Sequence, residues 1–280
     1  MNPNELSYCA RQVRRHDPER YLACLFAPAA RREALFALYG FNLEVAKTAE
    51  VVSEALLGRI RLQWWRDSLE EIYSGAARAH QVLGPLAEAI RDHGLSRTPF
   101  ETLIDAREGD LEREPPANLD ALETYAAATS GGLQVLALEI LGAAGAAEAA
   151  ARHVGIAWAL TGLLRAVPFH ARQRRLYLPD DLCRAAGLDV ASLFELQSSP
   201  ALCRVAEQVA GRARAHLKAA RAERGRVPRH ALPALLPARL AERHLARLDG
   251  AGHDPFRPSV QAEPTGAAWR LALAALVRRY

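Results

Sequence analysis

Leu35–Glu54, with the sequence LFALYGFNLEVAKTAEVVSE, is the stretch that decides the fold. Its apolar residues recur at steps of three and four, at positions Leu35, Leu38, Phe41, Val45 and Ala49. An α-helix turns once every 3.6 residues, so these side chains share one face. The stretch therefore predicts one long helix with a continuous apolar stripe.

Two positions on the same predicted helix bear on chemistry. Ala46 and Glu50 are four residues apart, so they lie one above the other on one face, with Lys47 between them. A magnesium site carried by a helical acid pair would have carboxylates at both positions, because Mg²⁺ prefers oxygen ligands. The helix has the spacing of such a site but only one of its two carboxylates.

The composition of the whole chain favours an all-α fold. Half of the 280 residues are hydrophobic, aromatic residues are few, and no run alternates apolar with polar residues as a half-buried strand would. The chain is long enough to bury a large core without disulfides or metal ions. No repeat and no linker divides it, so we expect a single helical domain over residues 19–280, preceded by a flexible segment at residues 1–18.

Apolar periodicity, prolines and glycines set the other expected helices. They span Glu19–Phe26, Ile60–Tyr73, Gln81–His93, Phe100–Leu111, Leu119–Gly142, Ala147–Val167, Pro200–Arg224, Ala231–Leu248 and Ala267–Tyr280, with a short helix from Asp180 to Gly187 and a loop over Gly250–Pro264. Pro168 should bend or end the helix around it. Adjacent Gly131 and Gly132 should mark a kink, or a place where another segment packs closely against the backbone.

The formal charge is mildly basic. A net charge of +4 on a chain of this length is accounted for by a solvated, arginine-rich surface. Nucleic-acid binding is not predicted, because the chain has no basic tail and no arginines interleaved with aromatic residues. A role for the arginines in contacting anionic lipid headgroups or a diphosphate stays open.

The cysteines and the hydropathy pattern favour a cytoplasmic protein. The four cysteines, Cys9, Cys24, Cys183 and Cys203, lack the spacing of a zinc or redox pair and are expected to be free thiols. The first residues, MNPNELSYCARQVRRHDPER, do not resemble a secretory signal, and no uncharged apolar run reaches the ~18 residues needed to cross a bilayer. Peripheral contact with the inner face of the cytoplasmic membrane stays open.

Four stretches resemble the squalene/phytoene synthase family of head-to-head prenyl transferases. They are RREALFALYGFN (31–42), LIDAREGDL (103–111), YAAATSGGL (125–133) and GLLRAVPFHARQRRLYLPDDL (162–182). The four occur in the family's order and roughly its spacing, and the resemblance extends over about residues 19–248. It implies an isoprenoid-synthase-type helical bundle around a central cavity.

In active members of that family, two aspartate-rich motifs hold the magnesium ions that bind the substrate diphosphates. The resemblance places these motifs on residues 46–50 and 166–170, so the four acid positions are Ala46, Glu50, Ala166 and His170. One carboxylate in four is too little negative charge to gather several divalent cations. The sequence therefore predicts no metal site and no confident catalytic residue, with Mg²⁺ as a cofactor only if the chain is catalytic.

The resemblance also assigns residues around the motifs. Diphosphate or headgroup binding falls on Arg165, Arg172, Arg174, Arg175 and Tyr177. The expected cavity residues are Phe41, Asp105, Asp110, Tyr125 and Gly131. A solvated loop is the alternative for the arginines of residues 172–175, and the step of five between the two aspartates spreads them too widely to favour a shared magnesium ion.

Three aromatic features keep alternative explanations. Trp64 and Trp65 are adjacent and face different directions, so at least one is expected in the core and the other is a candidate interface residue. His170 is expected to be a hydrogen-bonded residue at a helix end rather than a metal ligand. The C-terminal helix that contains Trp269 is expected to pack on the bundle, with a membrane surface as the alternative.

The segments FNLEVAKTAEVVSE, GRIRLQWWRDSLEEIY and LLRAVPFH resemble a branch of the family that acts in the assembly of respiratory complex I, NADH:quinone oxidoreductase. That resemblance implies a non-catalytic protein that binds a complex I subunit or assembly protein, or a prenyl lipid or quinone. One alternative is a magnesium-dependent head-to-head prenyl transferase acting on farnesyl or geranylgeranyl diphosphate in isoprenoid biosynthesis, with Glu50, Asp105, Asp110 and the arginine loop sharing the load. The other is a helical scaffold with no small ligand.

Overall fold

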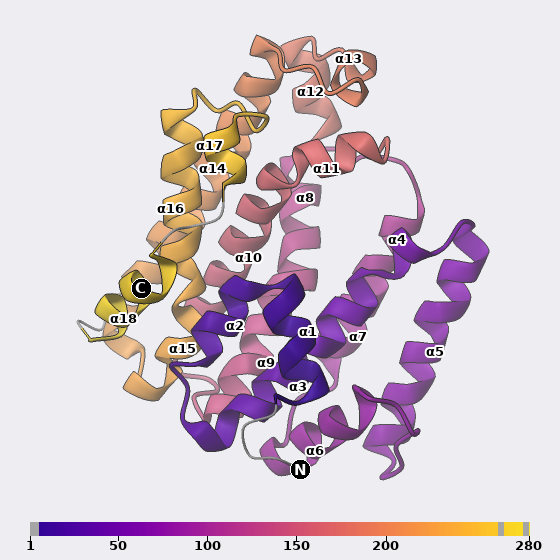
Figure 1. Ribbon diagram of the computed structural model, residues 1–280, viewed down its shortest axis with the longest axis vertical. Helices are drawn as coiled ribbons and strands as arrows, with labels where there is room; N and C mark the ends of the chain where they lie inside the picture. Colours follow the sequence, from indigo (N-terminus) through magenta and orange to yellow (C-terminus); the bar gives the residue numbers. More distant parts are fainter. Residues whose placement is uncertain (1–5, 263–265, 277–279) are drawn as a thin grey trace.

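The computed structural model describes residues 6–262, 266–276 and 280. All regular secondary structure in this part of the chain is helical and no strand occurs within it, so the all-α prediction is confirmed (Figure 1). The four cysteines are free thiols, and three of them are buried.

The helices follow one another with short connections. Those of the N-terminal half are α1 (Tyr8–His16), α2 (Pro18–Cys24), α3 (Ala29–Ala46), α4 (Thr48–Val51), α5 (Ala55–Tyr73), α6 (Leu83–His93), α7 (Thr98–Glu108), the 3₁₀ turn η1 (Gly109–Leu111), α8 (Leu119–Ala126), the π-helical turn η2 (Ala127–Gly131) and α9 (Gly132–Leu141). Those of the C-terminal half are α10 (Glu148–Arg165), α11 (Val167–Arg172), α12 (Asp180–Ala186), α13 (Val190–Phe194), α14 (Pro200–Ala222), η3 (Arg224–Arg226), η4 (Arg229–Ala231), α15 (Leu232–Leu235), α16 (Pro237–Gly250), α17 (Pro258–Gln261) and α18 (Ala267–Leu276).

Helix α10 lies near the centre of the bundle (Figure 1). It packs against α8, η2 and α9 as well as against α14 and α16. Its buried residues occupy more than one face, among them Val154, Ile156, Leu160 and Leu164. Such a helix has no single apolar stripe, because neighbours cover it on several sides.

The closest approach to α10 occurs where Gly155 faces η2. A Cβ atom at Gly155 would lie 2.7 Å from the Cα of Gly131 and would also clash with the carbonyl oxygen of Ser130. The helix backbone widens to a π-helical turn at the same place. The close packing expected at Gly131 and Gly132 is therefore present: Gly131 lies against α10, and Gly132 lies against Pro99 of α7.

The predicted continuous helix over Leu35–Glu54 is interrupted. α3 ends at Ala46, and the chain then forms only the four-residue helix α4 before it becomes extended. The β-branched residues Val51 and Val52, which have low helix propensity, fall at that end. The prediction that Ala46 and Glu50 share the face of one helix is therefore wrong, because different helices carry them.

The predicted flexible segment at residues 1–18 is wrong for residues 8–16, which form α1. This helix packs on α3 through small side chains, namely Cys9, Ala10 and Val13. Polar and charged residues make up most of this stretch, so the sequence alone suggests a loosely ordered segment, although the three buried residues share one helical face. Gly40 permits the contact, since a Cβ atom there would lie only 3.2 Å from the sulfur of Cys9.

Most other helix ends lie within a few residues of the predicted ones. α10 gives way to α11 just before Pro168, as expected. The predicted helix over Ala231–Leu248 is divided at Pro237 into α15 and α16, because proline removes a backbone donor and clashes with the preceding turn. The predicted loop over Gly250–Pro264 contains α17.

The tryptophans divide between core and surface. Trp65 is buried, whereas Trp64 is half-buried and lies beneath the guanidinium of Arg78. At the other end of the chain, α18 packs on α2 and α16 and buries Leu271. Trp269 on the same helix is 80% exposed.

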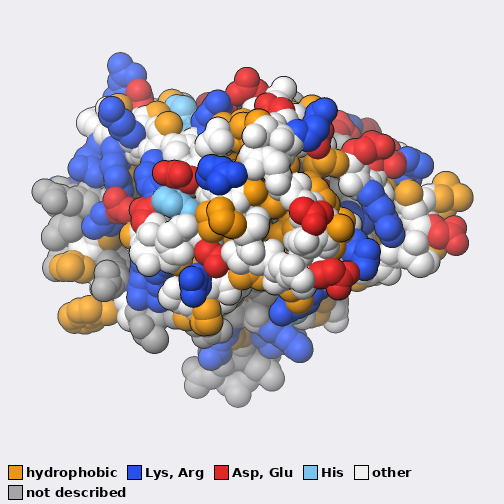
Figure 2. Space-filling view, turned by 90° about the horizontal axis from the view of Figure 1, so that it is seen from above, with side chains coloured by type: hydrophobic (Ala, Val, Ile, Leu, Met, Phe, Trp, Pro, Cys, Tyr) orange, Lys and Arg blue, Asp and Glu red, His pale blue; other side chains and the backbone are white. Residues whose placement is uncertain are grey.

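The surface carries both signs of charge. Figure 2 shows lysine and arginine side chains interspersed with aspartate and glutamate over the face seen from above. A mixed surface of this kind does not make the broad positive field that a nucleic-acid backbone attracts. Within the described residues, no helix combines the length and the apolar character that spanning a membrane requires.

We predict that Gly155→Ala destabilises the protein by at least about 2 kcal/mol, because the new methyl group would meet backbone atoms of η2 that cannot rotate away. The matched control is Gly211→Ala in α14, where a Cβ atom meets nothing within 4 Å. That change should stabilise by about 0.5–1 kcal/mol through helix propensity. Urea unfolding followed by circular dichroism measures both, and equal effects would contradict the packing described here.

Candidate functional site

Two adjoining cavities lie where α3 and α4 face the junction of α10 and α11. The first, which we call the Asp110 cavity, has a volume of about 80 Å³. The second, the Arg20 cavity, has a volume of about 200 Å³. They adjoin because they share four lining residues, Arg107, Tyr125, Leu163 and His170.

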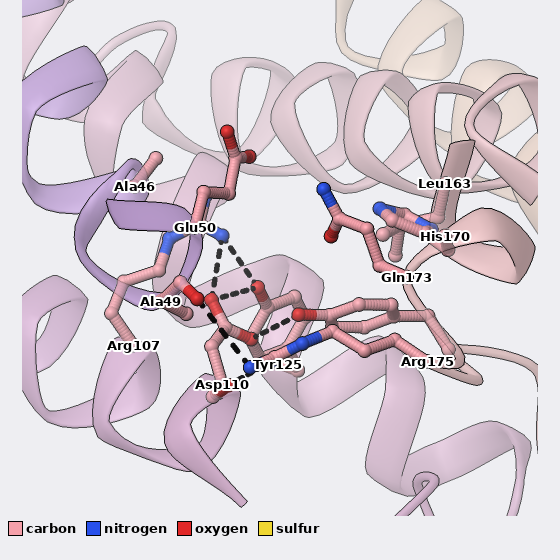
Figure 3. A pocket seen from close by; sticks show the side chains of 11 residues that line it. Ala46, Ala49, Glu50, Arg107, Asp110, Tyr125, Leu163, His170, Gln173 and Arg175 are labelled. Carbon is pink, nitrogen blue, oxygen red and sulfur yellow. Dashed lines mark hydrogen bonds and ion pairs between the residues drawn. The ribbon is translucent and has the colours of Figure 1, made fainter. Parts of the chain in front are cut away.

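The four positions predicted for the metal motifs all line these cavities. Ala46 and Glu50 line the Asp110 cavity, Ala166 lines the Arg20 cavity, and His170 lines both. Figure 3 shows Ala46 and Glu50 on one side of the opening and Leu163 and His170 on the other. The bundle therefore brings two segments that are more than 100 residues apart in sequence to one site.

Asp110 organises the floor of the first cavity (Figure 3). Its carboxylate, 4% exposed, accepts hydrogen bonds of 3.0 Å from Arg107 and from the hydroxyls of Tyr125 and Tyr177. Arg107 also donates to the Tyr125 hydroxyl at 2.6 Å. Burial raises the pKa of both tyrosines far above 10, so their hydroxyls remain protonated donors. Asp110 is thus fully engaged by protein groups.

Arg175 closes the same cluster from the loop after α11. It donates to the backbone carbonyl of Asp110 and, at 3.5 Å, to that of Ala49. These two bonds connect the loop to η1 and to α4. Arg175 therefore connects the segments at the mouth of the cavity. Of the four arginines predicted to bind a diphosphate or headgroup, Arg175 is the one that lines the Asp110 cavity.

His170 sits between the cavities with its ring 4.5 Å from that of Tyr177. Its Nδ1 atom is buried and has no hydrogen-bond partner among the described residues. Burial lowers the pKa of His170 to about 4; Asp110 opposes this shift, while Arg175 and Arg107 reinforce it. The ring is therefore neutral at pH 7. The sequence predicts that His170 is a hydrogen-bonded residue at a helix end, but its side chain makes no hydrogen bond with a described residue.

Glu50 stands at the rim of the Asp110 cavity. Its carboxylate makes no hydrogen bond or salt bridge with a described residue, and Figure 3 shows it directed away from the Asp110 cluster. Loss of water on the cavity side raises its pKa, and Asp110 adds to the effect, while Arg107, Lys47 and Arg175 oppose it. Glu50 is the one free carboxylate at the motif positions.

The Arg20 cavity has a polar floor and an apolar wall. The floor contains Arg20 and Asn42, which are 6% and 7% exposed, together with Thr129 and Ser130 of η2. The wall is a face of α10 that includes Trp158 and Leu163. Arg20 is fixed by hydrogen bonds of 3.1 Å to Asp17 and Ser130, and its guanidinium contacts the rings of Tyr39 and Trp158.

Several predicted site residues lie elsewhere. Phe41 is buried in the core, with edge-on contacts to Trp65 and Phe100. Asp105 is exposed and paired with Arg66, so it does not share a site with Asp110. The expectation for Asp105 fails because the five-residue step from Asp110 turns its side chain to the outside of the bundle. Gly131 is buried against α10 and lines neither cavity.

The basic residues are also dispersed. Arg174 is exposed and paired with Glu195, and Arg172 is exposed. Arg165 lines neither cavity; it donates to Glu19 at 3.0 Å, and Glu19 also pairs with His244 at 2.6 Å. The solvated-loop alternative therefore describes the first part of the loop, and the binding alternative applies to Arg175 and Tyr177 alone.

Sequence reasoning missed Arg20, Asn42 and Arg107. A signal existed for the first two. Arg20 precedes buried Ala23, Cys24 and Ala27 at helical spacing, and Asn42 lies on the stripe of Leu35, Leu38 and Val45. A polar residue inside an apolar stripe is a candidate for a buried functional group. Arg107 gave no such signal, because it lies among charged residues.

The donor set does not fit a magnesium cluster. Ala46 and Ala166 offer no oxygen, His170 offers a nitrogen that hard cations disfavour, and the Asp110 carboxylate is already taken by three donors. Among the described residues, no group of three or more histidine, cysteine, aspartate or glutamate side chains is arranged to hold a metal ion. Of the two carboxylates among the described lining residues, Glu50 and Asp110, Glu50 is the one that could act as a ligand without breaking an existing contact.

Comparison with known proteins places this site in context. The family model of squalene/phytoene synthase matches residues 13–271. Complex I assembly factor 6 of Bos taurus is 35% identical over 274 residues, which is 98% of this chain and 82% of that protein. The presqualene diphosphate synthase of Rhodopseudomonas palustris is 31% identical over 216 residues, which is 76% of this chain and 77% of that protein.

Solved structures support the same fold. The squalene synthase of Alicyclobacillus acidocaldarius superposes with a TM-score of 0.78 at 20% identity, over 89% of this chain and 94% of that one. A dehydrosqualene synthase in complex with a ligand gives a TM-score of 0.84 at 17% identity, over 97% and 95%. The predicted isoprenoid-synthase-type bundle is therefore confirmed.

We predict that Asp110→Asn destabilises the protein by about 3–5 kcal/mol, because it leaves the Arg107 charge without its buried partner. The control is Asp105→Asn, which breaks a pair whose carboxylate is 65% exposed and should cost less than about 1 kcal/mol. Chemical denaturation gives both free energies of unfolding. Similar values for the two variants would show that Asp110 does not organise the site.

The lowered pKa of His170 predicts an acid-sensitive fold. Because the folded protein resists protonating this ring, the unfolded state takes up its proton first as pH falls below about 6.5, and stability drops until the pH passes about 4. Wild type should lose about 2–3 kcal/mol more than His170→Gln over that interval. Unfolding measured at pH 7, 5.5 and 4 tests this. His230→Gln, which changes a histidine outside both cavities, should retain the wild-type loss; a parallel pH dependence of wild type and His170→Gln would refute the burial of the ring.

Proposed function

The chain belongs to the squalene/phytoene synthase family, and from that membership and the chemistry of its cavities we propose that it is a non-catalytic member that assists the assembly of respiratory complex I. It keeps the helical frame and a polar cavity at the motif positions. It uses them to bind a lipid or a partner protein rather than to transfer a prenyl group. Its partners in this role are a subunit or assembly protein of NADH:quinone oxidoreductase.

The observation that carries the proposal is the donor set around the cavities. Ala46, Ala166 and His170 supply no carboxylate where the resemblance places metal ligands. The remaining buried acid, Asp110, has its charge matched by Arg107 and its oxygens filled by Tyr125 and Tyr177. A departing diphosphate requires cations to neutralise it, and this site has no set of acids to recruit them.

The named relatives support the same reading. Besides the bovine protein, the human complex I assembly factor 6 is 34% identical over 259 residues, which is 92% of this chain and 78% of that protein. Similarity over nearly the whole length includes both helical segments that surround the cavities. We assign the protein to the cytoplasmic side of the membrane that contains complex I, as a peripheral rather than a spanning component.

The second candidate is a magnesium-dependent prenyl transferase. It is favoured by one comparison, the similarity to a presqualene diphosphate synthase, and by the free carboxylate of Glu50 beside Arg175 in the Asp110 cavity. In that case Mg²⁺ would be held by Glu50 with help from groups that are now paired. The substrates would be prenyl diphosphates of isoprenoid biosynthesis.

The deciding experiment is a deletion of the gene in the organism that encodes it, complemented with wild type or with Glu50→Gln. We expect the deletion to lower assembled NADH:quinone oxidoreductase on native gels while squalene-derived lipids and carotenoids stay constant. Glu50→Gln should restore the complex as well as wild type does, because no metal is needed. Loss of those lipids with the complex intact would establish the prenyl transferase instead.

The purified protein provides a direct measurement. Incubation with magnesium and farnesyl or geranylgeranyl diphosphate should release no pyrophosphate above the background of a protein-free control. Release at an enzyme-like rate that disappears in Glu50→Gln would refute the non-catalytic proposal.

A further inference from the structure

The outer face of α18 is apolar and exposed. Leu271 and Ala274 of this helix are buried against the bundle, whereas Trp269 and Leu273 lie on its opposite side and are exposed. The two exposed residues are four apart, so they lie one above the other on a single face. A helix that is apolar on two opposite sides is normally covered on both. The outer face of α18 is therefore a candidate for contact outside the chain.

An open groove of about 490 Å³ continues this apolar surface beside α18. Its apolar lining comes from α18, α15 and the turn after α2, and includes Ala275, Leu232 and Phe26. Arg229 and His230 of η4 line it as well. The groove shares no lining residue with the Asp110 cavity or the Arg20 cavity, so it is a feature separate from the candidate site.

The positive charge of the chain is concentrated in the segment that adjoins α18. Residues 221–247 contain seven arginines, no lysine, two glutamates and no aspartate, which gives a net charge of +5 with histidines neutral. The whole chain has a net charge of +4, so all its other residues together carry −1. The segment includes η3, η4, α15 and most of α16, and α16 packs directly on α18.

Contacts place several of these arginines next to the apolar surface. Arg229 lines the groove together with Ala275 of α18. Arg221 and Arg224 donate to the backbone carbonyl of Tyr280, the last residue of the chain, at 3.2 and 3.1 Å. The basic segment therefore adjoins both the groove and the chain terminus that follows α18.

We propose that the outer face of α18, with the groove and the arginines beside it, docks on the surface of a membrane that contains anionic lipids. The proposal rests on the peripheral placement proposed above and names the surface responsible. Trp269 and Leu273 enter the boundary between headgroups and acyl chains, where tryptophan is favoured because its ring is amphipathic. The arginines of residues 221–247 attract the anionic headgroups, and each contributes roughly a factor of five to the affinity.

A second exposed apolar pair, on α5, lacks this charge. Leu56 and Ile60 are also four residues apart and are 61% and 58% exposed. The sequence around them, residues 44–61, contains three acidic and three basic residues, and both of its arginines are paired with glutamates. The pair lies at the opposite edge of the molecule from α18 (Figure 1). Charge complementarity to an anionic surface therefore selects α18 over α5.

The experiment measures flotation of the purified full chain with lipid vesicles. One set is phosphatidylcholine alone, and the other also contains about 30% phosphatidylglycerol, which gives it a negative surface potential. Wild type should float with the anionic vesicles and not with the neutral ones, and added salt should weaken the binding because it screens the charges. Equal binding to both sets would overturn the proposal. So would absence of binding, which would leave an acidic protein as the partner of this surface.

The test variant is Trp269→Ala with Leu273→Ala, which removes apolar area from an exposed helix face and should leave the fold intact. Its affinity for anionic vesicles should fall at least about tenfold, because the apolar area it would have buried is gone. The matched control is Leu56→Ala with Ile60→Ala, a change of the same kind at the same spacing on α5. The control should bind as wild type does. An equal loss in both double variants, or a loss in the control alone, would refute the assignment to α18.

The contribution of charge is tested with Arg229→Gln, which should weaken binding to anionic vesicles about fivefold. Arg113→Gln is the matched control, because it removes one exposed arginine from the loop after η1, a turn that packs on α5. It should bind as wild type does. Equal losses in the two variants would show that net charge, not this face, governs the binding.

The fluorescence of Trp269 reports insertion directly. The other three tryptophans, Trp64, Trp65 and Trp158, are buried or half-buried, so a change on binding comes mainly from Trp269. Emission should shift to shorter wavelength on anionic vesicles, and an unchanged spectrum of bound protein would place another face at the membrane. These assays contain no complex I. Membrane docking and the assembly function can therefore fail separately, since vesicle binding tests the first and the gene deletion tests the second.

Discussion

The hydrogen-bonded charge of Asp110 holds the candidate site together. One buried carboxylate receives Arg107 from α7, Tyr125 from α8 and Tyr177 from the loop before α12. Through its backbone carbonyl it also receives Arg175, which reaches on to α4. Helix α8 and the loop between α11 and α12, whose tyrosines lie 15 and 67 residues from Asp110 in the sequence, thus meet on a single residue. Because a buried charge must be matched, each of these partners is required by the others, and the walls of both cavities are set by their positions.

This arrangement changes what the cavities can attract. A site that binds divalent cations needs carboxylate oxygens that are free to coordinate them. Here the oxygens of the buried Asp110 carboxylate already accept hydrogen bonds from an arginine and two tyrosines. The positive charge is supplied by the chain itself, through Arg20, Arg107 and Arg175. The match over residues 13–271 establishes family membership, and the structural similarity establishes the fold. Activity depends instead on the local side chains, which here are paired carboxylates and arginines rather than a set of free carboxylates.

The sequence predicted the fold well because amphipathic helices can be recognised from the 3.6-residue spacing of their apolar residues. The family resemblance, the all-α class and the end of a helix beside Pro168 are confirmed. The failures have physical causes. Residues 8–16 form α1, whose mostly polar composition indicates a loosely ordered segment when only composition is considered. Arg20 and Asn42 interrupt apolar stripes, and their role appears only when tertiary packing brings η2 and α10 alongside them. The sequence placed Asp110 and Tyr125 in the cavity but could not show that they bond to each other.

The π-helical turn at Ala127–Gly131 has a consequence for how this chain is compared with its relatives. A wide turn accommodates an additional residue within a continuous helix, with no loop to mark it. Each residue advances an α-helix by about 100°. Shortening the turn by one residue would therefore rotate α8 against α9 and swing Tyr125 off Asp110 while leaving the helix unbroken. The rotation of α8 relative to α9 about the helix axis therefore defines the site as much as any side chain does. A sequence alignment that misplaces one residue at this turn would match residues on different helix faces.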